Sequence, residues 1–589
     1  MRIKITAASL LVLALLGGCA SVSGPAVPHS PSSPSSPAKP EPIAQQAKKR
    51  AVTTAHPLAT TAALNILARG GSAVDAAIAA QMVLGLVEPQ SSGIGGGALA
   101  MHWDAQAARL TSFDGLSAAP SRVTAALSQD FDGKALKSED VARGSRSVGV
   151  PGALSVLKLL HEQHGKLPWA SLFEPEIQLA QDGFPFPRYM HTILSAPSAA
   201  KDHPDMLPLY FDAAQKILPS GSLIKNPAYA NTLKRIAQQG PTGFLAQGGA
   251  ANLVAGLQRG AYASMISEAD LRAYRAQPRE PLCAPFLAYK VCAMGPTSFG
   301  GVVVLQMLQM LEARLQGAAP AGKFNFDDPA FAHLYAEAGR LAQADRLHYI
   351  GDPAFYNVPS ASLIAAPYLK ERARLIDPTK SAPSVSPGAI DTKAAMLETA
   401  PSSETMDATS QIAIVDGQGN ALSVTTTNNL NFGSRLLIDG YVLNNAMTNF
   451  AALPRAGVTS PNKMELGKRP VTSMAPVIVF DAAGKPVVVG GSAGGFQIVD
   501  YITGSLIEML ANQRTPAQAL ARGNLSTAAT GKVQLEKDTP AAALAPALTA
   551  RGHNVEIVPL ISGQGFLMRQ GDGWMGAADP RRDGVAMGY

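Results

Sequence analysis

Helical spacing of apolar residues dominates the first two thirds of the chain. Ser72 and, three residues later, Asp75 form a capping-box pattern, which predicts that a helix begins at this point. This helix is expected to end near Val87, because Pro89 cannot continue it. The same apolar spacing predicts further helices at 57–69, 153–163, 305–315 and 331–346.

The last third of the chain has the residue pattern of strands. Short runs rich in β-branched residues alternate there with turn signals such as Asp-Gly-Gln-Gly-Asn at 416–420. A polar segment without periodicity, 383–407, precedes this part and is predicted to be an exposed connection. Helices followed by strands within one body predict the α+β class, with the elements stacked in layers. Strands are predicted at 411–415, 421–427, 435–438, 477–480 and 487–489, and a helix at 501–512.

The composition excludes several classes of protein. Of the 589 residues, 47% are hydrophobic and only 16% are charged, against about 25% in an average soluble protein, so general disorder is excluded. The 49 Lys and Arg exceed the 43 Asp and Glu by six, and no dense basic run follows the one at 48–50, so nucleic-acid binding is not expected. His161 and His164 form the closest histidine pair but lack a third ligand nearby, so we expect neither a metal nor another cofactor.

The first residues have the pattern of a targeting signal. A basic start precedes an apolar stretch, 5–16, that is shorter than the roughly 20 residues of a membrane-spanning helix. Leu-Gly-Gly-Cys follows and resembles a bacterial lipobox, so we predict that 1–18 is a lipoprotein signal peptide and that Cys19 is lipidated. Ala20 then favours a periplasm-facing lipoprotein of the outer membrane, whereas a plain cleaved secretory signal is the alternative. The Pro- and Ser-rich residues 19–48 are predicted to be a tether.

The remaining cysteines form a candidate pair. If Cys19 is lipidated, Cys283 and Cys292 are the two that remain, and they flank a predicted hairpin. An oxidising periplasm favours a disulfide between them, and two buried free thiols are the alternative.

Two segments have features of a catalytic nucleophile. Residues 490–494, Gly-Gly-Ser-Ala-Gly, fit a nucleophile elbow, in which Asp538 and His553 would complete a triad with Ser492. Such an elbow normally follows parallel βα units, whereas here it follows hairpin-like strands, so this interpretation is the weaker one. Thr409 lies where the polar segment meets a predicted strand. Cleavage before Thr409 would give it a free α-amine, whose pKa of about 7.7–8.0 lets it act as a base for its own hydroxyl.

An ordered series of motifs from about residue 51 to residue 589 resembles the γ-glutamyltransferases, a family of N-terminal-nucleophile hydrolases. The motifs are HPLA at 56–59, GSAVDAA at 71–77, VEP at 87–89, SSGIGGG at 91–97, VPG at 150–152, GKLPW at 165–169, ADR at 344–346, GDP at 351–353, KRPVTSM at 468–474, GSAGG at 491–495 and DPRRD at 579–583. Together they cover nearly the whole chain after the predicted tether.

The resemblance implies a four-layer αββα sandwich that is made as a proenzyme. Autoproteolysis between Ala408 and Thr409 would yield a large subunit, 49–408, and a small catalytic subunit, 409–589, which stay together as a heterodimer. Thr409 would then be both the new N-terminus and the nucleophile.

The resemblance also assigns roles to single residues. Thr427 corresponds to a second threonine that hydrogen-bonds the nucleophile. Gly494 and Gly495 correspond to the oxyanion-hole pair, whose backbone N–H groups stabilise the tetrahedral intermediate. That role explains the glycines of 490–494 better than a Ser492 nucleophile does. The substrate-binding residues that match the family pattern are Asn429, Thr472 and Ser473.

Two substrate-binding positions depart from the family pattern. Leu116 stands where the family has the Arg that binds the glutamyl α-carboxylate, and Asn449 stands where it has the Asp that pairs with the α-ammonium. A neighbouring family Gln or Glu falls on Ala446. Because charge-assisted hydrogen bonds are the stronger ones, loss of both charges indicates a changed acyl group, such as glutaryl. Arg122, a few residues after Leu116, is an alternative source of the missing charge.

These residues give a default function and three alternatives. The default is a self-processing glutathione hydrolase that transfers a γ-glutamyl group from a small-molecule amide to water or an amino acceptor, through an acyl-Thr409 ester. The first alternative is an acylase that uses the same machinery on non-amino acyl amides. The second is a non-catalytic anchored binding protein, and the third is the Ser492 hydrolase. No cofactor and no nucleic acid is expected, and the membrane is contacted through the lipid anchor alone.

Overall fold

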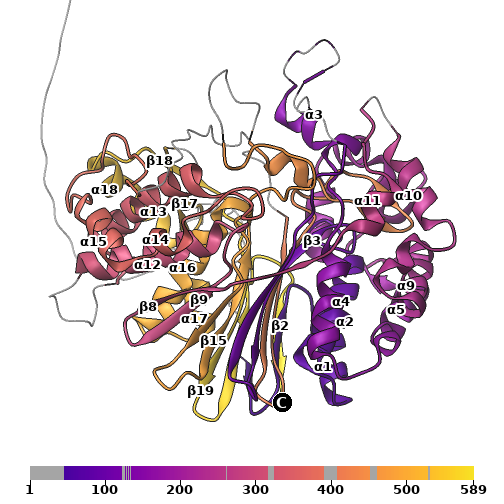
Figure 1. Ribbon diagram of the computed structural model, residues 1–589, viewed down its shortest axis with the longest axis horizontal. Helices are drawn as coiled ribbons and strands as arrows, with labels where there is room; N and C mark the ends of the chain where they lie inside the picture. The colour runs from indigo at the N-terminus through magenta and orange to yellow at the C-terminus, as the bar shows by residue number, and fades with distance from the viewer. Residues whose placement is uncertain are drawn as a thin grey trace, which may run out of the picture. The chain divides into compact units, whose positions relative to one another are not determined.

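The fold is built on two seven-stranded sheets in which all neighbouring strands are antiparallel (Figure 1). It contains mixed helices and sheets, so the predicted α+β class is confirmed. The computed structural model describes residues 45–122, 127, 129, 130, 132, 134, 136–259, 262–315, 324–390, 408–451, 460–527 and 531–589. The predicted signal peptide, Cys19 and residues 391–407 of the predicted connection lie outside these residues.

The first sheet contains the strand that follows Thr409, and we call it the Thr409 sheet. Its order is β21 (Val585–Gly588), β2 (Ala51–Thr54), β10 (Ser410–Val415), β11 (Ala421–Thr427), β3 (Gly97–Asp104), β4 (Arg109–Gly115) and β7 (Gln277–Arg279). β10 and β11 form a hairpin near the middle of this sheet, in which Ser410 pairs with Thr426. The strands predicted at 411–415 and 421–427 are therefore confirmed.

The second sheet faces the first. Its order is β1 (Gln45–Ala47), β20 (Gly573–Ala578), β19 (Gly563–Gln570), β15 (Pro486–Ala493), β14 (Val477–Phe480), β9 (Tyr289–Ala293) and β8 (Leu282–Phe286). β10 and β11 pack on β15, and apolar side chains such as Ala413, Ile478 and Leu567 fill the space between the sheets. β1 lies within the last residues of the predicted tether and pairs with β20.

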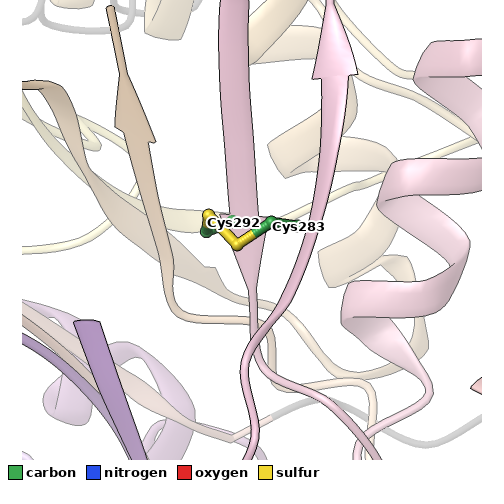
Figure 2. Close-up of a disulfide and its surroundings, with 2 residues drawn as sticks. All are labelled: Cys283 and Cys292. Atoms are coloured by element: carbon green, nitrogen blue, oxygen red, sulfur yellow. A yellow bond between two sulfur atoms is a disulfide. The ribbon is translucent and has the colours of Figure 1, made fainter. Parts of the chain in front are cut away.

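A disulfide joins the last two strands of the second sheet. Cys283 on β8 and Cys292 on β9 are directly opposite each other, with their Cα atoms 4.1 Å apart, and their sulfur atoms are bonded (Figure 2). The predicted pairing of these cysteines is confirmed.

Helices cover the outer side of each sheet. α1 (Pro57–Ala68) and α2 (Ala73–Val87) pack together, α2 lies on β10 and β11, and α4 (Ala153–His164) lies on β3 and β4. On the other side, α12 (Gly300–Leu315) packs on β8 and β9, and α16 (Ile498–Leu510) packs on β15. α13 (Pro329–Tyr349) and α15 (Ala366–Arg374) lie against α12. Figure 1 shows the two helical groups on opposite sides of the sheets.

All the predicted helices are present because their signals are local, although α12 begins five residues and α16 three residues before the predicted start. Ser72 and Asp75 exchange the two hydrogen bonds of a capping box, and every residue of α2 is buried. The strand predicted at 435–438 is shorter than expected: β12 covers Leu437–Ile438 alone, because Arg435 has a φ of 66° that a strand cannot accommodate. Among the described residues, no helix has the length and apolarity needed to cross a bilayer.

The remaining elements are short or peripheral. They are the helices α3 (Ser138–Ala142), α5 (Glu174–Asp182), α6 (Arg188–Leu194), α7 (Ala199–Asp202), α8 (Leu207–Tyr210), α9 (Pro227–Gln239), α10 (Gly249–Leu257), α11 (Glu268–Ala273), α14 (Ser360–Leu363), α17 (Pro516–Ala521) and α18 (Ala545–Ala550), and the strands β5 (Phe184–Pro185), β6 (Leu223–Ile224), β12 (Leu437–Ile438), β13 (Tyr441–Val442), β16 (Leu525–Ser526), β17 (Val533–Glu536) and β18 (Val555–Val558).

Candidate active site

The two threonines singled out from the sequence meet in the structure. Thr409 immediately precedes β10, and Thr427 is the last residue of β11, so the hairpin places them opposite each other. Thr409 Oγ1 donates a hydrogen bond to Thr427 Oγ1 at 3.0 Å. Thr427 Oγ1 also accepts the backbone N–H of Asn429 at 2.8 Å. Thr409 is 3% exposed, so its hydroxyl is oriented by protein groups rather than by bulk water.

The backbone around Thr409 is constrained. Ala408 is fully buried, and Thr409 has a φ of 149°, a region that residues with a side chain seldom adopt. Its carbonyl oxygen accepts a hydrogen bond from Nη1 of Arg582 at 2.8 Å. Arg582 is itself buried, and its guanidinium lies over the ring of Tyr189. The sequence placed Arg582 in the last motif but gave it no role, because the contact joins residues 173 positions apart.

A glycine turn lies at the same end of the sheets as Thr409. A Cβ on Gly491 of β15 would lie 2.5 Å from the side chain of Gln411, so the end of β15 packs on the start of β10. β15 is followed by Gly494, with a φ of 125°, and by Gly495, with a φ of 55°. At Gly494 an added Cβ would also lie 2.5 Å from the ring of Tyr501. Gly494 therefore requires glycine, and Gly495 has a left-handed φ that favours it.

The matching substrate-binding residues surround this turn and the hairpin end. Ser473 Oγ donates to the carbonyl of Gly495 at 2.6 Å, and the Oγ1 of its neighbour Thr472 accepts the N–H of Met474 at 3.3 Å. Asn429 follows Thr427 and donates from Nδ2 to Thr448 Oγ1 at 2.9 Å. This bond ties the loop after β11 to the segment that contains the other predicted residues.

The segment 446–449 is a short 3-10 turn that ends at Asn449. The carbonyl oxygen of Asn449 accepts a hydrogen bond from Asn462 Nδ2 at 2.7 Å. Ala446 and Asn449 both have neutral side chains, so this turn presents no carboxylate where the family pattern has one.

Leu116 follows β4 at the same end of the Thr409 sheet as Thr427, two strands away from it. A Cβ on Gly97 would be 3.0 Å from Leu116 Cα, and Gly97 pairs with Thr427 across β3 and β11. Leu116 is 5% exposed and belongs to the core cluster that includes Phe299 and Met474. Its carbonyl accepts a hydrogen bond from the hydroxyl of Tyr274 at 2.5 Å.

The guanidinium groups behind Leu116 are already paired. Buried Asp114 lies 3.2 Å from Arg279 and 3.4 Å from Arg469, and Arg279 also pairs with Asp352. These arginines therefore neutralise interior carboxylates and do not offer a spare charge at the position of Leu116. Arg122, the alternative source of charge, is exposed.

The nucleophile-elbow interpretation is wrong. Ser492 lies inside β15 instead of at a strand-to-helix turn, and its hydroxyl donates to the carbonyl of Ala493. The His553 ring bonds His333 at 2.7 Å, whereas Asp538 is exposed. Ser492 and His553 are thus bonded to other groups, and Asp538 faces solvent. Over the described part of the chain, no group of three or more His, Cys, Asp or Glu residues is arranged to hold a metal ion.

Comparison with known proteins agrees with this geometry. The family described as gamma-glutamyltranspeptidase matches residues 59–589. The glutathione hydrolase proenzyme of Bacillus subtilis (strain 168) is 30% identical over 554 residues, which cover 91% of each chain. The acylase ACY 1 proenzyme of Pseudomonas sp. (strain SE83) is 32% identical over 546 residues, which cover 91% of this chain and 92% of that protein.

Two solved structures are similar as well. The cephalosporin acylase of Bacillus halodurans superposes with a TM-score of 0.81, over 95% of this chain and 99% of that one, at 24% identity. This likeness concerns the fold. The gamma-glutamyltranspeptidase of Helicobacter pylori gives a TM-score of 0.53 at 27% identity, over 58% of this chain and 96% of that one.

Proposed function

We propose, from the premise that this chain belongs to the gamma-glutamyltranspeptidase family, that it is a self-processing amide hydrolase and acyltransferase whose nucleophile is Thr409. The contact between Thr409 and Thr427 is the observation on which this proposal rests, because it orients a buried hydroxyl at the end of a central strand. Two facing sheets with helices on their outer sides support a four-layer αββα sandwich of the N-terminal-nucleophile type.

The first reaction is cleavage of the chain. Thr409 Oγ1 attacks the carbonyl carbon of Ala408, the bond from that carbon to the Thr409 nitrogen breaks, and the nitrogen takes up a proton. The resulting ester is then hydrolysed by water, which leaves a carboxylate on Ala408 and a free α-amine on Thr409. The φ of Thr409 supports this step, since strained backbone costs about 1–3 kcal/mol and is found at reactive sites.

The second reaction uses the new N-terminus. The Thr409 α-amine accepts the proton of Oγ1 as the oxygen attacks the substrate amide. Backbone N–H groups at Gly494 and Gly495 stabilise the oxyanion, and loss of one such donor typically costs about 2.7–4 kcal/mol. The amine of the substrate leaves with a proton. Water or an amino acceptor then attacks the acyl-Thr409 ester and regenerates the free hydroxyl.

The acyl group remains to be assigned between two classes. The family default is γ-glutamyl, as in the glutathione hydrolases. A non-amino acyl group such as glutaryl is the second candidate, and the apolar Leu116, which stands where the family pattern has an arginine, favours it. The neutral Asn449 is consistent with the same choice, because an α-ammonium would lack its carboxylate partner there.

Two measurements test this function. Purified protein should separate into two fragments on a denaturing gel, whereas a Thr409→Ala variant should remain one band. The fragments should hydrolyse γ-glutamyl or glutaryl anilides, and the ratio of the two rates assigns the acyl class. A wild-type chain that stays in one piece and is indistinguishable from Thr409→Ala in both assays would show that Thr409 is not the nucleophile.

We also propose that the enzyme is a periplasm-facing lipoprotein of the outer membrane. The lipobox-like residues before Cys19 support this location. In a cell-fractionation experiment, Cys19→Ala should move the protein from the membrane fraction to the soluble fraction. Unchanged membrane association would remove Cys19 as the anchor.

A further inference from the structure

A buried carboxyl group lies behind the start of β10. Glu88, the residue that ends α2, is 1% exposed, and its Oε2 accepts a hydrogen bond from Ser410 Oγ at 2.7 Å. Ser92 Oγ donates to the same Ser410 hydroxyl at 3.0 Å. Ser92 and Ser410 are fully buried. The three side chains form one chain of hydrogen bonds that ends on the Glu88 carboxylate.

This chain of hydrogen bonds holds the residue next to the nucleophile. Ser410 follows Thr409 directly, so its anchorage to Glu88 restricts how the Thr409 main chain can move. Arg582 holds the other side of the same peptide through the Thr409 carbonyl. Glu88 and Arg582 also attract each other electrostatically. The nucleophile is thus placed between a buried anion and a buried cation that balance each other.

We propose that Glu88 is a positioning residue for Thr409: its carboxylate, acting through Ser410, fixes the start of β10 so that the Thr409 hydroxyl stays on Thr427, and its negative charge is needed for full activity. This inference rests on the proposed function, because it assumes that Thr409 is the nucleophile. Glu88 does not touch the reacting atoms, so its effect is on their placement.

The charge of Glu88 changes near neutral pH. Burial raises the pKa of Glu88 to about 7, while Arg582 and the hydrogen bond from Ser410 lower it and nearby Asp583 raises it. Asp583 is itself paired with Arg188 at 3.0 Å. The α-amine that cleavage creates on Thr409 is the other titrating group close by. Above pH 7 the Glu88 carboxylate holds Ser410 by a charge-assisted bond, which is about twice as strong as a neutral one.

The test compares the pH profile of kcat/KM for three variants with that of the wild type. Glu88→Gln keeps an acceptor for Ser410 but cannot ionise. Ser410→Ala removes the connection and leaves Glu88 in place. Glu176→Gln is the matched control: Glu176 is also 1% exposed, burial raises its pKa to about 8, and it lies on α5, which packs against α9.

The three variants are distinguished by how their activity, relative to the wild type, changes with pH. The ratio of wild-type to Glu88→Gln activity should be near one at about pH 5.5 and should rise to about tenfold at about pH 8.5, because only the wild type gains the charge. Ser410→Ala should lose the same pH-dependent gain as Glu88→Gln, since it removes the hydroxyl through which the Glu88 carboxylate holds the start of β10. Glu176→Gln should change activity by the same factor at every pH.

Each outcome decides a different point. If the wild type cleaves itself and turns over amides but its ratio to Glu88→Gln is constant with pH, the positioning role is refuted and the proposed function stands. If the wild type does neither, both are refuted. If Glu88→Gln does not fold, the Ser410→Ala profile decides: a ratio of wild-type to Ser410→Ala activity that rises with pH supports the role, and a ratio that is constant with pH overturns it.

Discussion

Replacing Thr427 by valine tests whether its hydroxyl, rather than its shape, prepares the nucleophile. Valine has nearly the same volume as threonine, so packing at the end of β11 should be kept. The change removes two hydrogen bonds, the one from Thr409 Oγ1 and the one from the Asn429 N–H. At about 1 kcal/mol for each neutral hydrogen bond, the loss is about 2 kcal/mol, which corresponds to roughly 30-fold in an equilibrium or a rate.

We expect Thr427→Val to slow both fragment formation and amide turnover by about 10- to 30-fold. Fragment formation is followed on a denaturing gel after synthesis of the precursor, and turnover is followed with an anilide substrate. Thr427→Ser is the control, because it keeps the hydroxyl and loses the methyl group; it should stay close to the wild type. Valine within twofold of the wild type, or serine as slow as valine, would refute the role given to the hydroxyl.

Three further predictions follow from other parts of the fold. Cys283→Ser with Cys292→Ser should lower the free energy of unfolding by roughly 2–3 kcal/mol, measured by urea titration, and a reductant should then have no additional effect. Leu116→Arg with Asn449→Asp should raise γ-glutamyl turnover relative to glutaryl turnover; an unchanged ratio would contradict the head-group argument. Burial lowers the pKa of His553 to about 4, so the native state favours its neutral form. Stability should be complete above pH 6.5 and should fall by on the order of 2 kcal/mol as the pH drops from 6.5 towards 4, a loss that His553→Gln should reduce.

The elements predicted from the sequence are those whose signals are local. The capping box of Ser72 and Asp75 marks the start of α2 by hydrogen bonds within one turn, so the sequence locates it without knowledge of the fold. The hairpin of β10 and β11 is marked by its turn residues and β-branched positions. Arg435 interrupts a predicted strand through a backbone angle that the residue type alone does not indicate.

The residues of the candidate site also differ in whether their contacts are local or distant in the sequence. Thr409 and Thr427 are 18 residues apart on one hairpin, and their pairing follows once the hairpin is known. Glu88 contacts Ser410 and Arg582 contacts Thr409 from opposite ends of the chain, at separations of 322 and 173 residues. Neither the spacing of hydrophobic residues nor the turn residues indicate which distant residues will meet. The contacts of these two residues were therefore found only in the structure.

Strands from before and after residue 408 lie side by side in the sheets, and this arrangement sets the order of folding and the proposed cleavage. In the Thr409 sheet, β21, β10 and β11 come from the residues after 408, whereas β2, β3, β4 and β7 come from those before it. Neither fragment contains all the strands of a sheet, so each would expose unpaired strand edges if it were made alone. Folding must therefore precede the proposed cleavage. The two fragments that this cleavage would give should elute from a gel-filtration column as a single particle until a denaturant unfolds both sheets together.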